Sequence, residues 1–489
     1  MDVASPNLDL YVRSGGEGRG QMKWNRGSLA WAAGVLLLAG RLMAAGPFDA
    51  SEYAARRARL MDKIGDGVAV FLGATAPTAT VAFRQGHDFV YLTGVQVPNA
   101  SLIVDGLRKE SILFFTMTEA EAAAEGIPRD MISDPKTYTG IERVLPADQF
   151  GPFLAGLCQR TKTLYTMFKP EELGPENSNE KFNTIQRTMI LNAWDGRLTR
   201  ELQFVRQLRD RFPQIEIRDC SPLVWELRKI KSPAELDVLR RAARIGVKAH
   251  RALILSTRPG ISEKSLAAVF EFVCGLEGAA GQAYSPILMS GKNHAYGHYH
   301  AYDRVLKPGD FVILDAGPDY ADYHVDISTW FPASGSFSAR QRELYEAALA
   351  VRDTCMANYR PGVSFRQVGE KVAAMLKAKG LEAYAKDFAG IIQYGGYNHM
   401  IGLATHDVVG RFAGPDEVLA PGFVFACDIQ LFRIDEEIGI RIEDTVAVTE
   451  NGCECLSLGV PRSVAEIEAL MKTDVILQVL PTKGLVRVD

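Results

Sequence analysis

The chain has 489 residues, of which 47% are hydrophobic, and its 55 basic and 59 acidic side chains leave a formal net charge of −4. A chain of this length is expected to form two or three domains with ordinary hydrophobic cores. The balance of charge excludes the strongly basic footprint that is typical of nucleic-acid-binding proteins. We therefore expect the partner to be a small molecule, a peptide or another copy of the chain.

The first segment, residues 1–45, contains the pattern of a secretory signal. From Met22 onward, basic residues, an apolar run at 29–40 and small residues follow one another, which is the order of such a signal. The apolar run is too short for a membrane-spanning helix. We expect cleavage near Ala45 and export of a mature protein without a membrane span, to the periplasm or the medium. An uncleaved N-terminal anchor is the alternative, and Met22 is a candidate natural start.

Residues 46–225 are predicted to form an α/β layer domain, because short apolar runs alternate with helical stretches. The predicted strands are the β-branched or aromatic runs at 67–74, 89–95, 100–106 and 111–117, and the predicted helices include 118–126 and 194–212. The pattern changes near residue 225. Ser232 has the features of an N-cap, with Pro233 in the first turn and Glu235 at the capping-box position, so a long helix should begin there.

The second domain, 226–489, contains an internal duplication. Residues 258–273 are similar to 360–376, and residues 306–317 are similar to 419–430. The offsets of 102 (258 to 360) and 113 (306 to 419) residues exceed the ~20–50-residue periods of solenoids. Each half is predicted to form two helices and a strand, and a pseudo-twofold axis would place equivalent strand ends opposite each other in one cleft.

Aspartates end the predicted apolar strands of both halves. Asp315 follows the apolar run 311–314, and Asp428 is its equivalent in the second half. Asp326 follows Asp315 by eleven residues (315 to 326), and a hairpin would bring both carboxylates to one point. A buried ionised carboxylate is costly unless it is paired or bound to a metal. Capping or turn roles are the alternative for two such aspartates.

Further ligand candidates lie close to these strands. Glu443 and Arg441 share one face of the alternating strand 437–448, where a surface ion pair is the alternative interpretation. Five of the eight histidines lie in the stretches 293–303 and 398–408. Carboxylates with one imidazole suit Mn²⁺, or Co²⁺ or Zn²⁺ by substitution, and bridging carboxylates can hold two divalent ions.

These stretches resemble the pita-bread metallohydrolases, specifically aminopeptidase P and prolidase, which cleave peptide bonds to the nitrogen of proline. The resemblance spans roughly residues 48–460, and the stretches that carry it are LDAGPDYADYHVD (314–326), NHMIGLATHD (398–407), GIRIEDT (439–445), 83–104 and 228–236. It implies an α/β N-terminal domain followed by an α+β pita-bread catalytic domain of duplicated helix-helix-strand halves with pseudo-twofold symmetry.

By position, the resemblance implies a dinuclear centre of two divalent ions, with Mn²⁺ expected first and Co²⁺ or Zn²⁺ as alternatives. The implied ligands are Asp315, Asp326, His399, Asp428 and Glu443. His298 and His406 would contact the substrate, and Arg441 would orient the neighbouring carboxylates.

The implied activity is release of the N-terminal residue from peptides with proline in second position, or a related dipeptidase activity. A pita-bread hydrolase acting on a different C–N or small-molecule substrate, and a catalytically weak binding homologue, are the alternatives. Homo-oligomers are common in the family, so a homo-oligomer is a further possibility.

The sequence departs from the family pattern at three places. Asp428-Ile429-Gln430 stands where the family usually has Glu followed by Pro-Gly, Gly395 stands where a His is common, and 326–331 lacks the usual Arg. The shorter Asp428 side chain would require a cation closer to the strand, or would remove a bridge.

Overall fold

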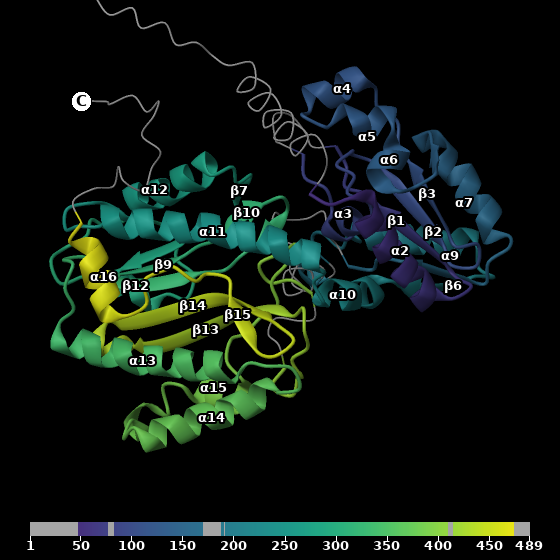
Figure 1. Ribbon diagram of the computed structural model, residues 1–489. Coiled ribbons are helices and arrows are strands. Elements are labelled where there is room, and N and C mark those ends of the chain that lie inside the picture. Colours follow the sequence, from purple (N-terminus) through teal and green to yellow (C-terminus); the bar gives the residue numbers. More distant parts are fainter. Residues whose placement is uncertain (1–46, 77–82, 170–186, 190, 409–413, 474–489) are drawn as a thin grey trace, which may run out of the picture. The chain divides into compact units, whose positions relative to one another are not determined.

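The computed structural model describes residues 47–76, 83–169, 187–189, 191–408 and 414–473 (Figure 1). The predicted signal segment lies outside these residues, so cleavage near Ala45 and export stay predictions. Among the described residues, no helix has both the length and the apolar character that a membrane span requires.

The first part of the chain contains a six-stranded sheet with the order β4-β3-β2-β1-β5-β6. The strands are β1 (Val68–Leu72), β2 (Ser101–Asp105), β3 (Glu110–Phe114), β4 (Arg143–Leu145), β5 (Thr163–Thr166) and β6 (Glu216–Asp219). The helices are α2 (Ala50–Ile64), α3 (His87–Thr93), α4 (Glu119–Ala124), α5 (Arg129–Ser133), α6 (Pro135–Thr139), α7 (Phe150–Cys158), α9 (Arg200–Arg211) and α10 (Ser221–Lys229). This arrangement confirms the predicted α/β class.

The predicted strand at 89–95 is wrong, because residues 89–93 belong to helix α3. All seven residues of α3 are buried, and Gly94 ends the helix in the left-handed region with φ of 70°. An apolar segment that is buried on every side has no polar face, so its periodicity cannot separate a helix from a strand. The helix predicted at 194–212 begins later, at Arg200, where the Thr199 side chain accepts a hydrogen bond from the Leu202 amide.

The second part contains an antiparallel sheet with the order β13-β14-β12-β9-β8, and β15 pairs with β14. These strands are β8 (Ile287–Ser290), β9 (Phe311–Asp315), β12 (Ser328–Pro332), β13 (Val424–Arg433), β14 (Ile438–Val448) and β15 (Cys453–Cys455). A small sheet, β11-β10-β7, comprises β7 (Gly281–Gln282), β10 (Pro318–Tyr320) and β11 (Tyr323–His324). The helices are α11 (Pro233–Ser256), α12 (Glu263–Leu276), α13 (Ala339–Asn358), α14 (Phe365–Ala378), α15 (Ala389–Tyr394) and α16 (Val464–Met471).

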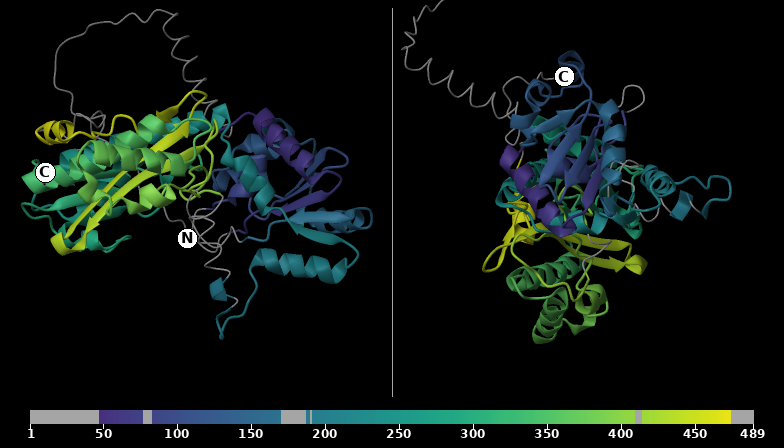
Figure 2. Two further views of the ribbon diagram at one scale, coloured as in Figure 1. Left: turned by 90° about the horizontal axis from the view of Figure 1, so that it is seen from below. Right: turned by 90° about the vertical axis from the view of Figure 1, so that its right-hand side faces the viewer.

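The duplication predicted from sequence is present as two helix-helix-strand halves. Helices α11 and α12 precede β8 and β9, and helices α13 and α14 precede β13 (Figures 1 and 2). Helix α11 begins with the predicted capping box, in which Ser232 and Glu235 bond each other's backbone amides. One hydrophobic core joins all four helices to the large sheet.

One expectation about the strand ends is corrected by the structure. Asp315 is the last residue of β9, as predicted, but β13 continues past Asp428 to Arg433. The reason is that Ile429 and Leu431 extend the apolar alternation and their strand stays paired with β14. Asp428 is therefore an interior residue of its strand.

A buried ion network connects the first part of the chain to the second. Arg228 on α10 donates to Asp88 at 2.7 Å and also to Asp407, and Lys231 lies 3.2 Å from Asp407. All four side chains are at least nine-tenths buried. Because Asp407 directly follows His406, this network fixes the chain beside a predicted substrate-contacting residue.

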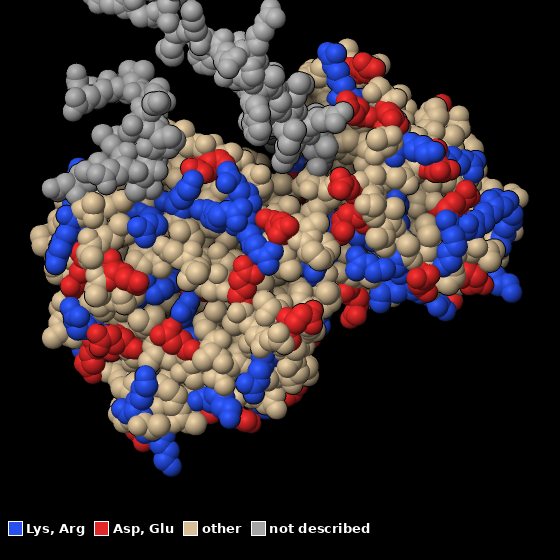
Figure 3. All heavy atoms as spheres, viewed as in Figure 1, with Lys and Arg blue, Asp and Glu red and all other residues tan. Residues whose placement is uncertain are grey.

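Charged side chains of both signs are interspersed on the face drawn in Figure 3. Helix α11 carries pairs of this exposed kind, such as Lys248 with Glu277 at 2.7 Å and Arg240 with Glu454 at 2.8 Å. Exposed pairs contribute only about 0–1 kcal/mol. We therefore expect the buried pairs of Arg228 to matter more for stability.

Replacing Arg228 by methionine tests this expectation. Because Asp88 and Asp407 would stay buried after losing a cationic partner, the free energy of unfolding should fall by about 3–5 kcal/mol. The shift of the urea unfolding midpoint measures the loss. The control Arg366→Met removes an exposed 2.7 Å pair with Asp416 and should leave the midpoint almost unchanged, because solvent screens exposed pairs. Equal, small shifts in both variants would contradict the role of the network.

Candidate metal centre

Four polar residues form a row across the large sheet. The strand register places Asp315 opposite Ser328, Ser328 opposite Glu443, and Glu443 opposite Asp428. Directly opposed residues on neighbouring strands point to the same face, with β-carbons about 4.5–5.5 Å apart. Three carboxylates therefore share one face of the sheet, although they are far apart in the sequence.

This face is opposite to the one that packs on helices α13 and α14. Cys427 and Ile429 of β13 and Ile442 of β14 belong to the core that these helices share with the sheet. Successive strand residues point to opposite faces, so Asp428 and Glu443 point away from that core. This agrees with the alternation predicted for the strand 437–448, since Ile440 and Ile442 lie in the core and Glu443 points away from it.

Asp326 and His399 extend the row from two loops. The Asp326 amide donates to the Thr445 hydroxyl at 2.9 Å, and the His399 carbonyl accepts from the Ala426 amide at 2.9 Å. The His399 Nε2 atom lies 3.5 Å from Asp326 Oδ2 and 3.6 Å from Glu443 Oε1. One potential ligand atom from each of these three buried side chains lies within 4.8 Å of the others.

Arg441 holds the two carboxylates at the ends of the row. Its guanidinium donates to Asp315 and makes two bonds to Asp428, at 2.9 and 3.2 Å. The Gln430 amide, which lies opposite Arg441 in the register, also donates to Asp428. Asp428 Oδ1 thus accepts from Arg441, and Asp428 Oδ2 accepts from both Arg441 and Gln430. Arg441 thus contacts two of the carboxylates that it is predicted to orient, and the orienting role stays a prediction.

Tyr284 contacts two of the carboxylates at once. Its hydroxyl lies 2.5 Å from Asp315 Oδ1 and within hydrogen-bond distance of Asp326. A hydroxyl group donates one proton only, so two ionised carboxylates on one hydroxyl would repel each other. A proton on one carboxyl group, or a cation between the two, resolves this repulsion.

The metal-free cluster contains more acidic groups than basic ones, and this excess affects the pKa values of its carboxyl groups. Burial, and next the negative charge of Asp315, raise the pKa of Asp326 well above its ordinary value. Burial, and next the charge of Asp326, raise the pKa of Glu443 in the same way. Four carboxyl groups thus surround one guanidinium in a region with little access to water.

The cluster fits a divalent cation. Among the described residues, neither His399 Nε2 nor Glu443 Oε1 has a hydrogen-bond partner, although both atoms are buried. His399 Nδ1 lies 3.5 Å from the Met400 carbonyl oxygen, which favours the tautomer with a free lone pair on Nε2. Carboxylate oxygens with one imidazole nitrogen form a donor set for Mn²⁺, Co²⁺ or Zn²⁺.

The two predicted substrate-contacting histidines lie in different surroundings. The His406 ring is half-buried and lies 4.1 Å from the His399 ring, centroid to centroid. His298 lies on an exposed loop between η2 (Gly291–Ala295) and β9, and among the described residues no hydrogen bond or ion pair joins it to the cluster. The structure brings His406 to the site, and the role of His298 stays a prediction.

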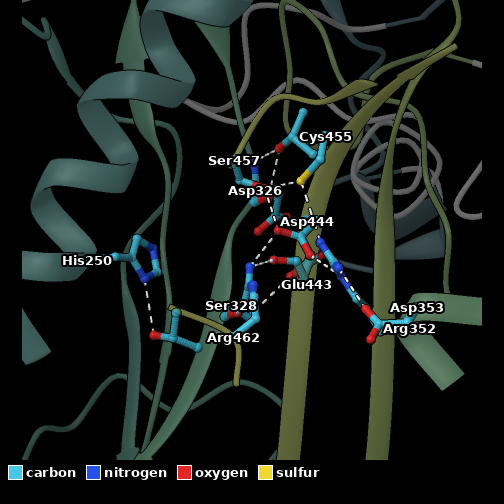
Figure 4. Close-up of polar contacts among 12 residues, drawn as sticks. His250, Asp326, Ser328, Arg352, Asp353, Glu443, Asp444, Cys455, Ser457 and Arg462 are labelled. Atoms are coloured by element: carbon cyan, nitrogen blue, oxygen red, sulfur yellow. Dashed lines mark hydrogen bonds and ion pairs between the residues drawn. The ribbon is translucent and has the colours of Figure 1, made fainter. Parts of the chain in front are cut away.

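Three contributors were missed by reasoning from sequence: Tyr284, Gln430 and Ser328. The Ser328 hydroxyl donates to Glu443 Oε2 at 2.7 Å (Figure 4). Its place two residues after Asp326 in an apolar strand was an available signal. No local sequence pattern marks Tyr284 as a site residue, because the residues that it contacts come from distant segments of the chain.

Gly395, one of the departures from the family pattern, has a local structural reason. It ends α15 with φ of 79°, and a β-carbon at this position would lie 2.4 Å from the β-carbon of Phe365. A histidine here would require both a strained backbone and movement of Phe365.

Binding of a divalent cation should release protons. The raised pKa values keep Asp326 and Glu443 protonated at pH values where free carboxyl groups are ionised, and a cation would displace those protons. Protonation of these groups stabilises the metal-free fold at low pH, and this contribution is lost as the pH rises through the raised pKa values.

We therefore expect Mn²⁺ affinity to rise with pH. Calorimetric titration in two buffers of different ionisation enthalpy measures the protons released per ion. Equal binding heats in the two buffers would contradict proton displacement.

Known proteins share both parts of this chain. Residues 237–450 match metallopeptidase family M24, and residues 53–165 match the aminopeptidase P N-terminal domain. The position predicted as the domain boundary, near 225, lies between these matches and inside α10. The Xaa-Pro aminopeptidase of Escherichia coli K12 is 30% identical over 447 residues, which cover 86% of this chain and 97% of that protein.

Other relatives and solved structures are similar to this chain over most of its length. The mitochondrial intermediate cleaving peptidase 55 of Arabidopsis thaliana is 28% identical over 86% of this chain and 82% of its own length. The structure of aminopeptidase P from E. coli with the inhibitor Pro-Leu has a TM-score of 0.69 at 28% identity, covering 87% of this chain and 98% of that one. The Pseudomonas aeruginosa aminopeptidase PepP has a TM-score of 0.70 at 28% identity over 87% and 98%. This protein, with its carboxylate row and both matched domains in order, belongs to metallopeptidase family M24.

Proposed function

We propose that the protein is a metal-dependent aminopeptidase that releases the residue before proline from the N-terminus of a peptide. The observation that carries this proposal is the convergence of Asp326, His399 and Glu443 on one sheet face of an M24 chain. The relatives named Xaa-Pro aminopeptidase, which align along most of both chains, support the same activity.

The proposed cofactor is a pair of divalent cations, with Mn²⁺ first because oxygen donors dominate the site. The proposed ligands are Asp315, Asp326, His399, Asp428 and Glu443. Bound in this row, the cations would lower the pKa of a water molecule and polarise the scissile carbonyl group.

The protein side chains would position the substrate and move the proton. His406, half-buried beside His399, is placed to donate a hydrogen bond to the oxygen on which negative charge develops. A carboxylate of the row, such as Glu443, would accept the proton of the attacking water and pass it to the proline nitrogen.

Proline specificity would come from shape and from the absence of an N–H group. The scissile nitrogen of an Xaa-Pro bond carries no hydrogen, so the site needs no acceptor for it. A homo-oligomer stays a prediction, because the described structure contains one chain.

One observation favours a second candidate, a homologue with a weakly held second cation. Asp428 is a methylene shorter than the usual glutamate, and its Oδ1 accepts from Arg441 while its Oδ2 accepts from Arg441 and Gln430. Those contacts compete with a cation for the same oxygens. A weakly active or purely binding protein would follow if the cation lost this competition.

An assay of the full chain distinguishes these candidates. The protein is freed of metal with a chelator, reloaded with Mn²⁺, Co²⁺ or Zn²⁺, and given a short Xaa-Pro peptide beside the same peptide with alanine in second position. We expect release of the first residue from the proline peptide only. Asp326→Asn should lower kcat/KM by more than about 100-fold, because loss of even an outer partner of a metal site costs 10–100-fold.

The control for this variant is Asp105→Asn. Asp105 is a buried aspartate at the end of β2 that accepts a bond from the Arg108 amide, and its replacement should leave the rate unchanged. Equal cleavage of both peptides would contradict proline specificity. Two tightly bound ions without release of any residue would shift the proposal to another substrate, and weak binding without turnover would support the binding homologue.

A further inference from the structure

Arg462 lies behind the carboxylate row, in the segment between β15 and α16 (Figure 4). It stands twelve residues beyond residue 450, where the match to family M24 ends. Its side chain is about nine-tenths buried. An arginine buried to this extent needs partners for its donors, and these partners identify its role.

The guanidinium of Arg462 joins the two central strands of the site. Nη1 donates to the Ser328 carbonyl and Nη2 to the Glu443 carbonyl, both at 2.6 Å. Ser328 and Glu443 are also the one pair of residues that β12 and β14 place opposite each other. The planar guanidinium, with its donors at fixed angles, therefore connects the strands at the row itself.

Asp444 holds Arg462 in this orientation. Its carboxylate accepts from Arg462 at 2.7 Å, from Arg352 at 2.8 Å and from the Ser457 hydroxyl at 2.5 Å (Figure 4). These three contacts fix Asp444, which anchors Arg462 on the face away from the row.

Ser328 and Glu443, whose carbonyl groups Arg462 binds, also interact through their side chains on the face of the sheet that carries the row. The Ser328 hydroxyl donates to Glu443 Oε2, and Oε1 is left 3.6 Å from His399 Nε2. This side-chain bond forms only if Ser328 and Glu443 stay opposite each other. The backbone contacts of Arg462 fix that alignment.

We propose that Arg462 is a positioning residue of the metal centre, which holds the Ser328 and Glu443 carbonyls so that Glu443 presents Oε1 to the cation. The proposal rests on the metal dependence in the proposed function. It assigns no contact between Arg462 and substrate or cation.

The test compares Arg462→Met and Arg462→Lys with wild type in the full chain. Mn²⁺ affinity is measured by calorimetric titration, and kcat and KM are measured separately on an Xaa-Pro peptide. Arg462→Met should bind Mn²⁺ about 10- to 100-fold more weakly, as is typical for loss of an outer partner. It should lower kcat more than it changes KM. The lysine variant keeps one donor and should recover part of the affinity.

Arg57→Met is the matched control. Arg57 is also buried and also donates to two carbonyl groups, those of Leu92 and Thr139 at 2.7 and 2.8 Å, but it lies in the first part of the chain. We expect this variant to lose thermal stability while its Mn²⁺ affinity stays at the wild-type value. An equal loss of affinity in both methionine variants would show a general effect of destabilisation and would overturn the proposal.

Added guanidinium gives a second readout. A cavity of about 720 Å³ is lined by Arg462, Arg352 and Arg251, so the free ion can reach the position that Arg462→Ala vacates. Millimolar guanidinium should restore metal affinity in Arg462→Ala and should leave the affinity of Arg57→Met unchanged. Wild-type affinity and kcat in Arg462→Met would overturn the proposal and leave the peptidase function intact. A wild type that binds Mn²⁺ without cleaving the peptide would contradict only the peptidase function.

Discussion

The structure of the second part depends on the repulsion among carboxylates on one face of a sheet. Asp315, Glu443 and Asp428 occupy one transverse row, and Asp326 joins them from a loop. Ionised carboxylates at such spacing in a buried region cannot coexist without opposite charge. Arg441 supplies one positive charge, and divalent cations would supply the remainder. The loops and side chains around the row serve to keep these donors in place.

The hydrophobic core determines which residues form the row, because it fixes the register of the strands. The residues that adjoin the row members along each strand, such as Cys427 and Ile442, pack into the core shared with the helices. A slip of one residue would turn Asp428 or Glu443 into that core and expose its apolar neighbours. The energy that stabilises the fold therefore also specifies which carboxylates meet. This coupling explains why a metal site can be assembled from residues separated by more than a hundred positions.

Local patterns in the sequence were sufficient to predict part of the site. The alternation around Glu443 gave its face, the duplication gave the helix-helix-strand halves, and the resemblance implied the ligand set. The register between strands could not be predicted, since it depends on packing across the whole sheet. For this reason Tyr284 and Arg462, which reach the row from distant segments, had no local signal. The buried helix α3 was missed because no polar face marked its period.

Diffraction from crystals loaded with Mn²⁺ tests the central claim most directly. Anomalous difference maps on the two sides of the manganese absorption edge locate the ions without reference to activity. We predict one peak bounded by Asp326, His399 and Glu443, and a second peak between Asp315 and the carboxylates that bind both ions. The Arg441 guanidinium should then have moved away from Asp315. A map without a peak in the row, with Arg441 still bound to both Asp315 and Asp428, would show that the guanidinium alone compensates the carboxylates and would contradict the account.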